Sequence, residues 1–268
     1  MIKIFFDTHA HYDSKEFNDD REIKLNQLKD YIILNSGTNI ESSKSSVYLA
    51  NKYDSVFASI GIHPNYVENL DIKKTISELK NLAKNKKVLA IGEIGLDFCF
   101  NNKNKIDNKI IKKQILFFEA QLNLAKKLDL PVVIHSRNSR KETLRIIKKN
   151  KNNFGSIHCF NYDNEFADQI IKLGYYLGIG GIITFKNSKE LCDTIRNIDI
   201  KNVVLETDTP YISPTPFRGK RNDSSNLKYV CEKISQVKNI SYHHVKNMAF
   251  DNALNLFFKN KRYDLKTS

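Results

Sequence analysis

The sequence lacks the cysteine pairs that mark zinc ribbons and disulfide-rich folds. Its 268 residues contain four cysteines, Cys99, Cys159, Cys192 and Cys231, which are far apart and form no C-x-x-C motif. No apolar run reaches the roughly 18 residues needed to cross a bilayer. The start, MIKIFFDTHAHYD, has too short an apolar stretch for a signal peptide. These absences predict a soluble cytoplasmic protein with reduced cysteines.

Nucleotide-binding loops and domain boundaries are missing as well. Neither G-x-G-x-x-G nor G-x-x-x-x-G-K-[ST] follows any apolar run, which excludes the common dinucleotide and P-loop sites. No internal repeat, linker or low-complexity segment divides the chain. We therefore predict a single domain over residues 1–268, with an extra helical tail at about 241–260 that packs outside the main fold.

Apolar runs and segments of helical periodicity alternate along the chain. The predicted strands are 2–7, 31–36, 56–61, 88–92, 132–135, 156–158, 175–179 and 203–206. The predicted helices are 19–29, 40–52, 72–84, 107–128, 139–149, 164–173, 188–197 and 227–237. Strict alternation predicts parallel strands joined by helical crossovers, and eight units predict an α/β fold of the closed (β/α)8 TIM-barrel type. A doubly wound open sheet alternates similarly, but it gathers its ligands at one switch point.

The chain is strongly basic, with a net charge of +13 and a pI near 9.4. A basic field favours an anionic partner such as nucleic acid. An equally simple explanation is compositional drift, because Lys, Asn and Ile are abundant throughout. Charge alone does not distinguish an anionic partner from compositional drift.

Five of the seven histidines lie at or just beyond the ends of predicted strands, and so do two carboxylates. The set is His9, His11, His63, His135, His158, Glu93 and Asp208. The carboxyl ends of parallel barrel strands meet at one edge, so these side chains should lie close together. Imidazoles and carboxylates gathered in this way are the composition of a metal-hydrolase centre, which we predict at the C-terminal ends of the strands.

Glu93 is the side chain expected to hold two divalent ions together, because a carboxylate can bridge two cations and an imidazole nitrogen cannot. One predicted site contains His9, His11, Glu93 and Asp208, and the other contains Glu93, His135 and His158. Two cations about 3.5–4 Å apart can hold a bridging hydroxide and clamp both oxygens of a displacement. Asp208 and Glu93 are thus the predicted catalytic residues, with Asp208 as a ligand or general base. Asp7 is expected to orient a ligand histidine, and Cys159 to point into the core.

Substrate groups are expected around this centre. The loop PYISPTPFRGKRN after the last strand presents Arg218, Lys220 and Arg221, and arginines there can pair with phosphate oxygens. Arg137, beside His135, can do likewise. His63 is left out of the metal set and can contact a phosphate or protonate the leaving oxygen, while Glu206 can hydrogen-bond the substrate or orient a neighbour.

Seven ordered motifs carry a family resemblance. DTHAHYD, GIHP, GEIGLD, IHSR, HCF, ETDTPY and RGKRN resemble the motifs of TatD-type metal-dependent deoxyribonucleases, in the wider amidohydrolase-like barrel group, over about residues 4–258. The resemblance implies a TIM barrel and a divalent-metal DNase, commonly magnesium-dependent and exonucleolytic. It likens His63 to the family's substrate-side histidine and places Arg218 and Arg221 in its phosphate-side loop. It implies six metal ligands: His9, His11, Glu93, His135, His158 and Asp208.

The chain departs from the family pattern at three places. This chain has GLDFCF where the family has a GLDYY-like sequence. It has HSRNSR where the family has an HSRDA-like sequence, so Asn138 replaces an aspartate. It has RGKRNDSSN where the family has an RGKRNEP-like sequence, and Asp223 keeps a carboxylate there. None of these changes removes a predicted ligand, so they bear on substrate preference.

Three functions remain open at this point. The first is a two-metal DNase acting on DNA as a monomer without an obligate protein partner or membrane. The second is a metal-dependent amidohydrolase or esterase for a small or tRNA-linked substrate, and the third is a basic nucleic-acid-binding barrel without catalysis. The resemblance favours Mg²⁺, whereas a histidine-rich set also suits Mn²⁺ or Zn²⁺.

Overall fold

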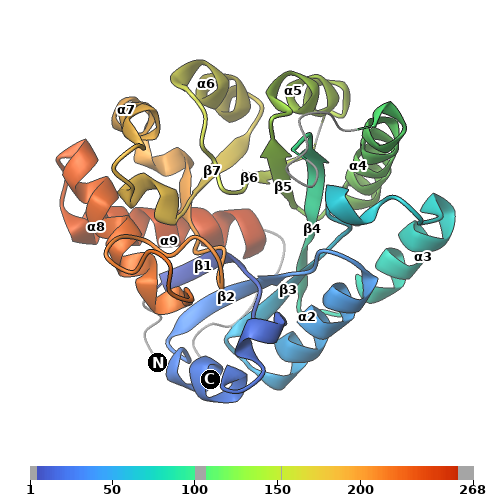
Figure 1. Ribbon diagram of the computed structural model, residues 1–268, viewed down its shortest axis with the longest axis horizontal. Coiled ribbons are helices and arrows are strands. Elements are labelled where there is room, and N and C mark those ends of the chain that lie inside the picture. The colour runs from blue at the N-terminus through green and yellow to red at the C-terminus, as the bar shows by residue number, and fades with distance from the viewer. Residues whose placement is uncertain (1–4, 100–106, 152, 259–268) are drawn as a thin grey trace.

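A computed structural model describes residues 5–99, 107–151 and 153–258. Within these residues, eight parallel strands form one sheet in the order β1 to β8, which confirms the predicted TIM barrel (Figure 1). The strands are β1 (Phe5–Ala10), β2 (Tyr31–Ser36), β3 (Val56–Ile60), β4 (Val88–Asp97), β5 (Val132–Arg137), β6 (Gly155–Ile157), β7 (Tyr175–Ile179) and β8 (Val203–Leu205).

Helices surround the strands and cover the outer face of the sheet (Figure 1). Their sequences alternate buried apolar and exposed charged positions, as packing against a barrel requires. Several begin at an aspartate that accepts a backbone hydrogen bond, as Asp71 does from Lys74 N. The helices are α1 (Arg21–Gln27), α2 (Ile40–Lys52), α3 (Ile72–Leu82), α4 (Asn108–Leu128), α5 (Arg140–Lys149), α6 (Asn164–Lys172), α7 (Lys189–Asn197), α8 (Leu227–Lys238) and α9 (Tyr242–Phe258).

Most predicted boundaries agree with these elements within a few residues, and the largest differences lie at strand ends. β1 continues to Ala10 and so contains His9, while predicted positions 2–4 lie outside the described residues. β4 is ten residues long and ends at Asp97, five residues beyond the predicted end. The extra residues of both strands carry polar groups to the C-terminal edge of the barrel.

The barrel closes between β1 and β8 close to that edge. Ala10 and Thr209 form an isolated parallel bridge, and His11 N donates to the Thr209 carbonyl at 2.8 Å. Asp208 N donates to the His9 carbonyl at 2.9 Å. The hydrogen bonds that close the barrel therefore also fix the positions of the residues that follow these two strands.

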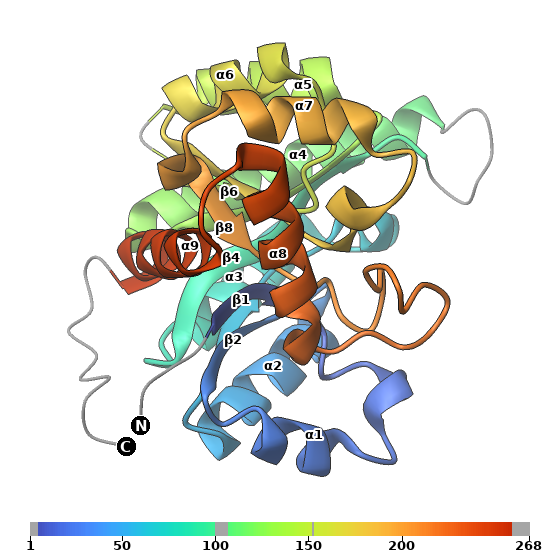
Figure 2. The ribbon, with the colours of Figure 1, turned by 90° about the vertical axis from the view of Figure 1, so that its left-hand side faces the viewer.

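Helix α9 packs at the opposite end of the barrel rather than on its outer side (Figures 1 and 2). The Phe257 ring lies 5.6 Å from that of Phe6 near the start of β1, and the Phe258 ring lies 5.0 Å from that of Phe57 near the start of β3. These aromatic rings join an apolar cluster with buried residues from β1 to β5 and β8. The tail thus seals the N-terminal end and leaves the C-terminal edge open. Among the described helices, none is long and apolar enough to span a membrane.

Candidate metal centre

The closure of β1 against β8 brings two histidines and an aspartate together. His9 Nε2 and His11 Nε2 are 3.0 Å apart, as expected for residues two apart on a strand end. Asp208 Oδ1 lies 3.6 Å from His9 Nε2 and 3.4 Å from His11 Nε2. Asp208 adopts a left-handed backbone conformation (φ 55°), which turns its carboxylate into the barrel mouth. All three side chains are largely or wholly buried.

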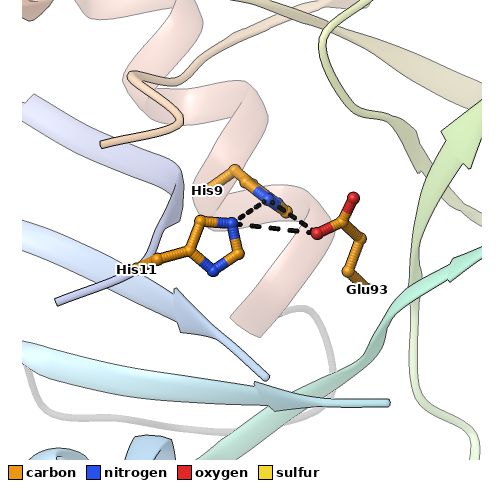
Figure 3. Close-up of side chains that lie close together, drawn as sticks. All are labelled: His9, His11 and Glu93. Atoms are coloured by element: carbon orange, nitrogen blue, oxygen red, sulfur yellow. Dashed lines mark hydrogen bonds and ion pairs between the residues drawn. The ribbon is translucent and has the colours of Figure 1, made fainter. Parts of the chain in front are cut away.

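Glu93 stands between this group and a second one. Its Oε2 lies 3.4 Å from His9 Nε2 and 3.8 Å from His11 Nε2 (Figure 3). Its Oε1 lies 2.9 Å from His135 Nδ1 and 3.0 Å from His158 Nε2. The two oxygens of one carboxylate therefore face two different pairs of imidazoles, which is the arrangement that a bridging ligand needs.

Ser36 holds both imidazoles of the first pair from behind. His11 Nδ1 donates to the Ser36 carbonyl at 2.8 Å, so Nδ1 keeps its proton and, in the neutral ring, Nε2 offers a lone pair to the centre. His9 Nδ1 lies 3.2 Å from Ser36 Oγ. A fixed tautomer with Nε2 facing inward is what a ligand histidine requires.

Carboxylates lie behind the imidazoles of the second pair. His158 Nδ1 lies 3.4 Å from Glu206 Oε1, and His135 Nε2 lies 3.4 Å from Asp97 Oδ2. The structure thus places the predicted substrate residue Glu206 behind His158, where it is 1% exposed and its Oε1 accepts a hydrogen bond from Cys159 N at 2.5 Å. Gly178 on β7 leaves the space it needs, since a Cβ there would lie 2.3 Å from Glu206 Oε2.

Asp97 is absent from the predicted set of site residues. The predicted fourth strand ends at residue 92, whereas β4 continues to Asp97 and brings its carboxylate to His135. The spacing of Glu93 and Asp97 contains the missing signal, because residues four apart on a continuing strand share one face. With His63 and His135, Asp97 also forms a group whose ligand atoms lie within 4.8 Å of one another.

His63 is oriented differently from the other four histidines. Its Nδ1 accepts a hydrogen bond from Asn65 N at 3.1 Å, so in the neutral ring the proton lies on Nε2. That nitrogen lies 3.5 Å from Glu93 Oε1. Burial lowers the pKa of His63 to about 3, which keeps the ring neutral. His63 therefore presents a hydrogen-bond donor to the centre rather than a lone pair.

The remaining electrostatics show that the centre attracts positive charge. Burial lowers the pKa of His11, but Asp208 and Glu93 outweigh it and raise the value to about 9. Burial likewise opposes the charged form of His158, yet Glu93 and Glu206 raise its pKa well above the ordinary value. Burial raises the pKa of Glu93, and the surrounding imidazoles bring it well below its usual range. Protons on buried imidazoles thus balance the carboxylates, a task that divalent cations perform equally well.

The donor set fits divalent ions. The ligand atoms of His9, His11 and Glu93 lie within 4.8 Å of one another, and so do those of Glu93, His135 and His158. Imidazole nitrogens and carboxylate oxygens without cysteine suit Mg²⁺, Mn²⁺ or Zn²⁺. The predicted metal ligands are thus all brought to one place, including Asp208, which groups with His9 and His158.

An open cavity of about 990 Å³ leads from the surface to this cluster. Arg137, a predicted substrate group, lines this cavity. Arg218 and Lys220 instead line an adjoining cavity of about 620 Å³, which shares Tyr211 as a wall. Arg221 borders the adjoining cavity too, but its guanidinium forms a two-pronged ion pair with Asp20.

Two neighbouring residues differ from expectation. Asp7 contacts a predicted ligand histidine through that residue's backbone rather than its ring: its carboxylate accepts hydrogen bonds from His9 N at 3.4 Å, Thr207 N at 2.9 Å and Ser224 Oγ at 2.6 Å, and burial raises its pKa to about 7. It therefore ties β1 to the chain beyond β8. Cys159 lines the cavity instead of the core, because β6 ends at Ile157 and Cys159 has a left-handed backbone (φ 48°) that breaks the strand alternation.

Strand-end imidazoles around a shared carboxylate place the chain among the metal-dependent hydrolases built on a TIM barrel. The family model described as TatD related DNase matches residues 6–258, and the chain belongs to that family.

Relatives and solved structures match almost the whole chain. The uncharacterized metal-dependent hydrolase YabD of Bacillus subtilis is 32% identical over 262 residues, covering 95% of this chain and 99% of YabD. A metal-dependent hydrolase of Buchnera aphidicola subsp. Acyrthosiphon pisum, also uncharacterized, is 35% identical over 271 residues with the same coverage. The crystal structure of YJJV, a TatD homolog from Escherichia coli, superposes with a TM-score of 0.87 at 27% identity, covering 96% of this chain and 99% of YJJV.

Proposed function

We propose that this hydrolase is a deoxyribonuclease. It hydrolyses phosphodiester bonds at a centre of two divalent ions and releases nucleotides from the ends of DNA. One observation carries the proposal: Glu93 presents Oε2 to His9 and His11, and Oε1 to His135 and His158. Family membership and the cationic groups beside the cavity support DNA as the substrate.

Divalent ions bound to these residues would polarise a phosphoryl oxygen and ease the ionisation of water. The protein's own groups supply the rest. Asp208, next to His11 at 3.4 Å, keeps a carboxylate at neutral pH because the histidines lower its pKa against the effect of burial. It is the group that accepts a proton from the attacking water. The Nε2–H of His63 donates a hydrogen bond to a non-bridging phosphate oxygen, where negative charge develops.

Cations outside the metal cluster hold the DNA backbone. Arg137 lines the main cavity and Arg218 and Lys220 line the adjoining one. The Arg218 guanidinium lies 4.0 Å from the Phe185 ring centroid, which fixes its position while leaving its N–H groups available. Among the described residues, no carboxylate forms an ion pair with Arg218 or Lys220. Arg221, which Asp20 neutralises, instead anchors the loop to the start of α1.

The test is hydrolysis of 5′-labelled single-stranded and nicked DNA by chelator-treated protein that is reloaded with Mg²⁺, Mn²⁺ or Zn²⁺. We expect stepwise release of nucleotides from an end. Glu93→Gln and Asp208→Asn should abolish cleavage, whereas the matched surface changes Glu142→Gln and Asp193→Asn should leave it unchanged, because these two side chains pair only with exposed arginines on their own helices.

The outcome separates the alternatives. Internal fragments in place of mononucleotides would make the enzyme an endonuclease. Intact DNA with every metal, together with hydrolysis of a carboxylic ester or amide in the same preparation, would overturn the proposal in favour of an amidohydrolase or esterase. Absence of stoichiometric metal and of all hydrolysis would favour a nucleic-acid-binding barrel.

A further inference from the structure

Two half-exposed tyrosines lie at the mouth of the metal centre. Tyr66, in the short helix η2 (Pro64–Tyr66) after β3, is 51% exposed, and Tyr211, after β8, is 52% exposed. Both line the cavity that leads to the cluster. Single exposed aromatic side chains are common on protein surfaces, so exposure alone would mean little. Their shared position at one cavity mouth sets these two apart.

Each tyrosine ring lies against a histidine of the centre. The Tyr211 ring centroid is 6.2 Å from that of His11, and the Tyr66 ring centroid is 6.3 Å from that of His63. A nucleobase stacked on either tyrosine would therefore be separated from a phosphate at the metal cluster by about the width of one aromatic ring. The distance between a nucleobase and the phosphate of the same nucleotide is similar.

The backbone of Tyr211 is held firmly although its ring is open to solvent. Tyr211 N donates to the Asp208 carbonyl at 2.9 Å, and Asn222 Nδ2 donates to the Tyr211 carbonyl at 2.8 Å. The backbone that carries the ring is thus fixed relative to the proposed catalytic carboxylate. A residue whose backbone is fixed before binding loses less conformational entropy when a ligand stacks on its ring.

Tyr211 also separates the two cavities. It borders the metal cavity on one side and, on the other, the adjoining cavity that contains Arg218 and Lys220. A strand with one phosphate at the metal cluster and the next near these cations would pass across the tyrosine. The position between successive phosphates is where a base projects.

We propose that Tyr66 and Tyr211 form an aromatic platform on which the unpaired bases beside the scissile phosphate stack. This inference rests on the proposed DNase function and adds the two side chains that would hold the bases of an unpaired end. Stacking accepts every base because each has a π-face, so the platform selects unpaired DNA without selecting sequence. Bases inside a duplex are already paired and stacked and do not reach it.

The experiment compares a ten-nucleotide thymidine strand with an abasic strand of the same length, which keeps the phosphates and lacks the bases. With the metal-loaded wild type, kcat/KM should be at least about tenfold higher on the thymidine strand. Tyr66→Ala and Tyr211→Ala should each raise KM about tenfold on that strand and change it less than twofold on the abasic one. Tyr211→Phe keeps the ring and should therefore keep the preference for the thymidine strand over the abasic one. Tyr48→Ala is the matched control, since Tyr48 is 63% exposed on α2 and lines a different cavity.

The outcomes distinguish the two proposals. If the wild type cleaves the thymidine strand but the alanine variants lose activity equally on both strands, the tyrosines only position His11 and His63, and the platform is wrong. If the alanine variants lose nothing on either strand, the platform is also wrong while the DNase proposal stands. Cleavage of neither strand with Mg²⁺, Mn²⁺ or Zn²⁺ would overturn the DNase proposal itself.

Discussion

Glu93 is the carboxylate around which the histidines gather, so replacing it with glutamine removes the main negative charge of the cluster. Its side chain is 5% exposed, and its Oε1 lies 2.9 Å from His135 Nδ1 and 3.0 Å from His158 Nε2. Removing one partner from a buried ion pair costs about 3–5 kcal/mol, because the remaining charge is uncompensated. We expect metal-free Glu93→Gln to lose about this much free energy of unfolding at pH 6.

The loss should shrink as the pH rises, because an imidazolium ion can release its proton. The pKa of His158 in the folded protein is well above 6.5, and that of His11 is about 9. Stability from these raised values is complete below 6.5, the unfolded value, and disappears as the pH rises through the folded values. The depressed pKa of Glu93 contributes stability above 4.5 and loses it only as the pH falls through the folded value, so this contribution is intact at pH 6.

Urea denaturation of chelator-treated protein at pH 6 and pH 9.5 measures both quantities. The difference between wild type and Glu93→Gln should be several-fold larger at pH 6. Glu142→Gln, which removes a carboxylate from an exposed pair on α5, should shift neither curve by more than about 0.5 kcal/mol. Equal destabilisation at the two pH values, or none at pH 6, would refute the charge balance described for the cluster.

Four further outcomes follow from the geometry. Glu206→Gln should weaken metal binding about 10–100-fold in a chelator competition, because the substitution loosens His158. The control Asp193→Asn should leave metal affinity unchanged, and equal affinities for wild type and Glu206→Gln would show that Glu206 has no orienting role. His63→Ala should lower kcat about 10²-fold with unchanged metal content by elemental analysis, and loss of metal would make His63 a ligand instead. Metal affinity measured by calorimetry should rise with pH up to about 9, and binding at pH 7 should release a proton, because the metal displaces the proton on His11. An affinity that does not change with pH would contradict the raised pKa of His11. Phe257→Ala should cost about 3–5 kcal/mol in urea denaturation while metal affinity stays unchanged, and altered metal affinity would show that α9 does more than seal the far end of the barrel.

The sequence was sufficient to predict the barrel and the six-residue cluster because periodicity and chemistry coincide. Each polar residue of the cluster ends or follows an apolar run, and parallel strands necessarily bring such residues to one edge. His135 and His158 are far apart in sequence, yet β5 pairs with β6 and places their nitrogens 3.3 Å apart. The order of the strands is therefore enough to bring these two residues together.

What the sequence could not supply depends on where strands stop and which side chains pair. Asp97 was missed because the glycine-rich end of β4 reads as a loop, although the strand continues through it. Cys159 was misplaced because alternation was carried past the end of β6. The pairing of Arg221 with Asp20 joins residues 201 positions apart, which no local pattern shows.

We propose that Glu93 lies between two metal sites. Anomalous diffraction from crystals soaked in Mn²⁺ can test this, because the signal locates each ion without assumptions about the ligands. We expect two peaks about 3.5–4 Å apart, one at Oε2 of Glu93 beside His9 and His11, the other at Oε1 beside His135 and His158. A single peak, or peaks that do not share Glu93, would contradict it.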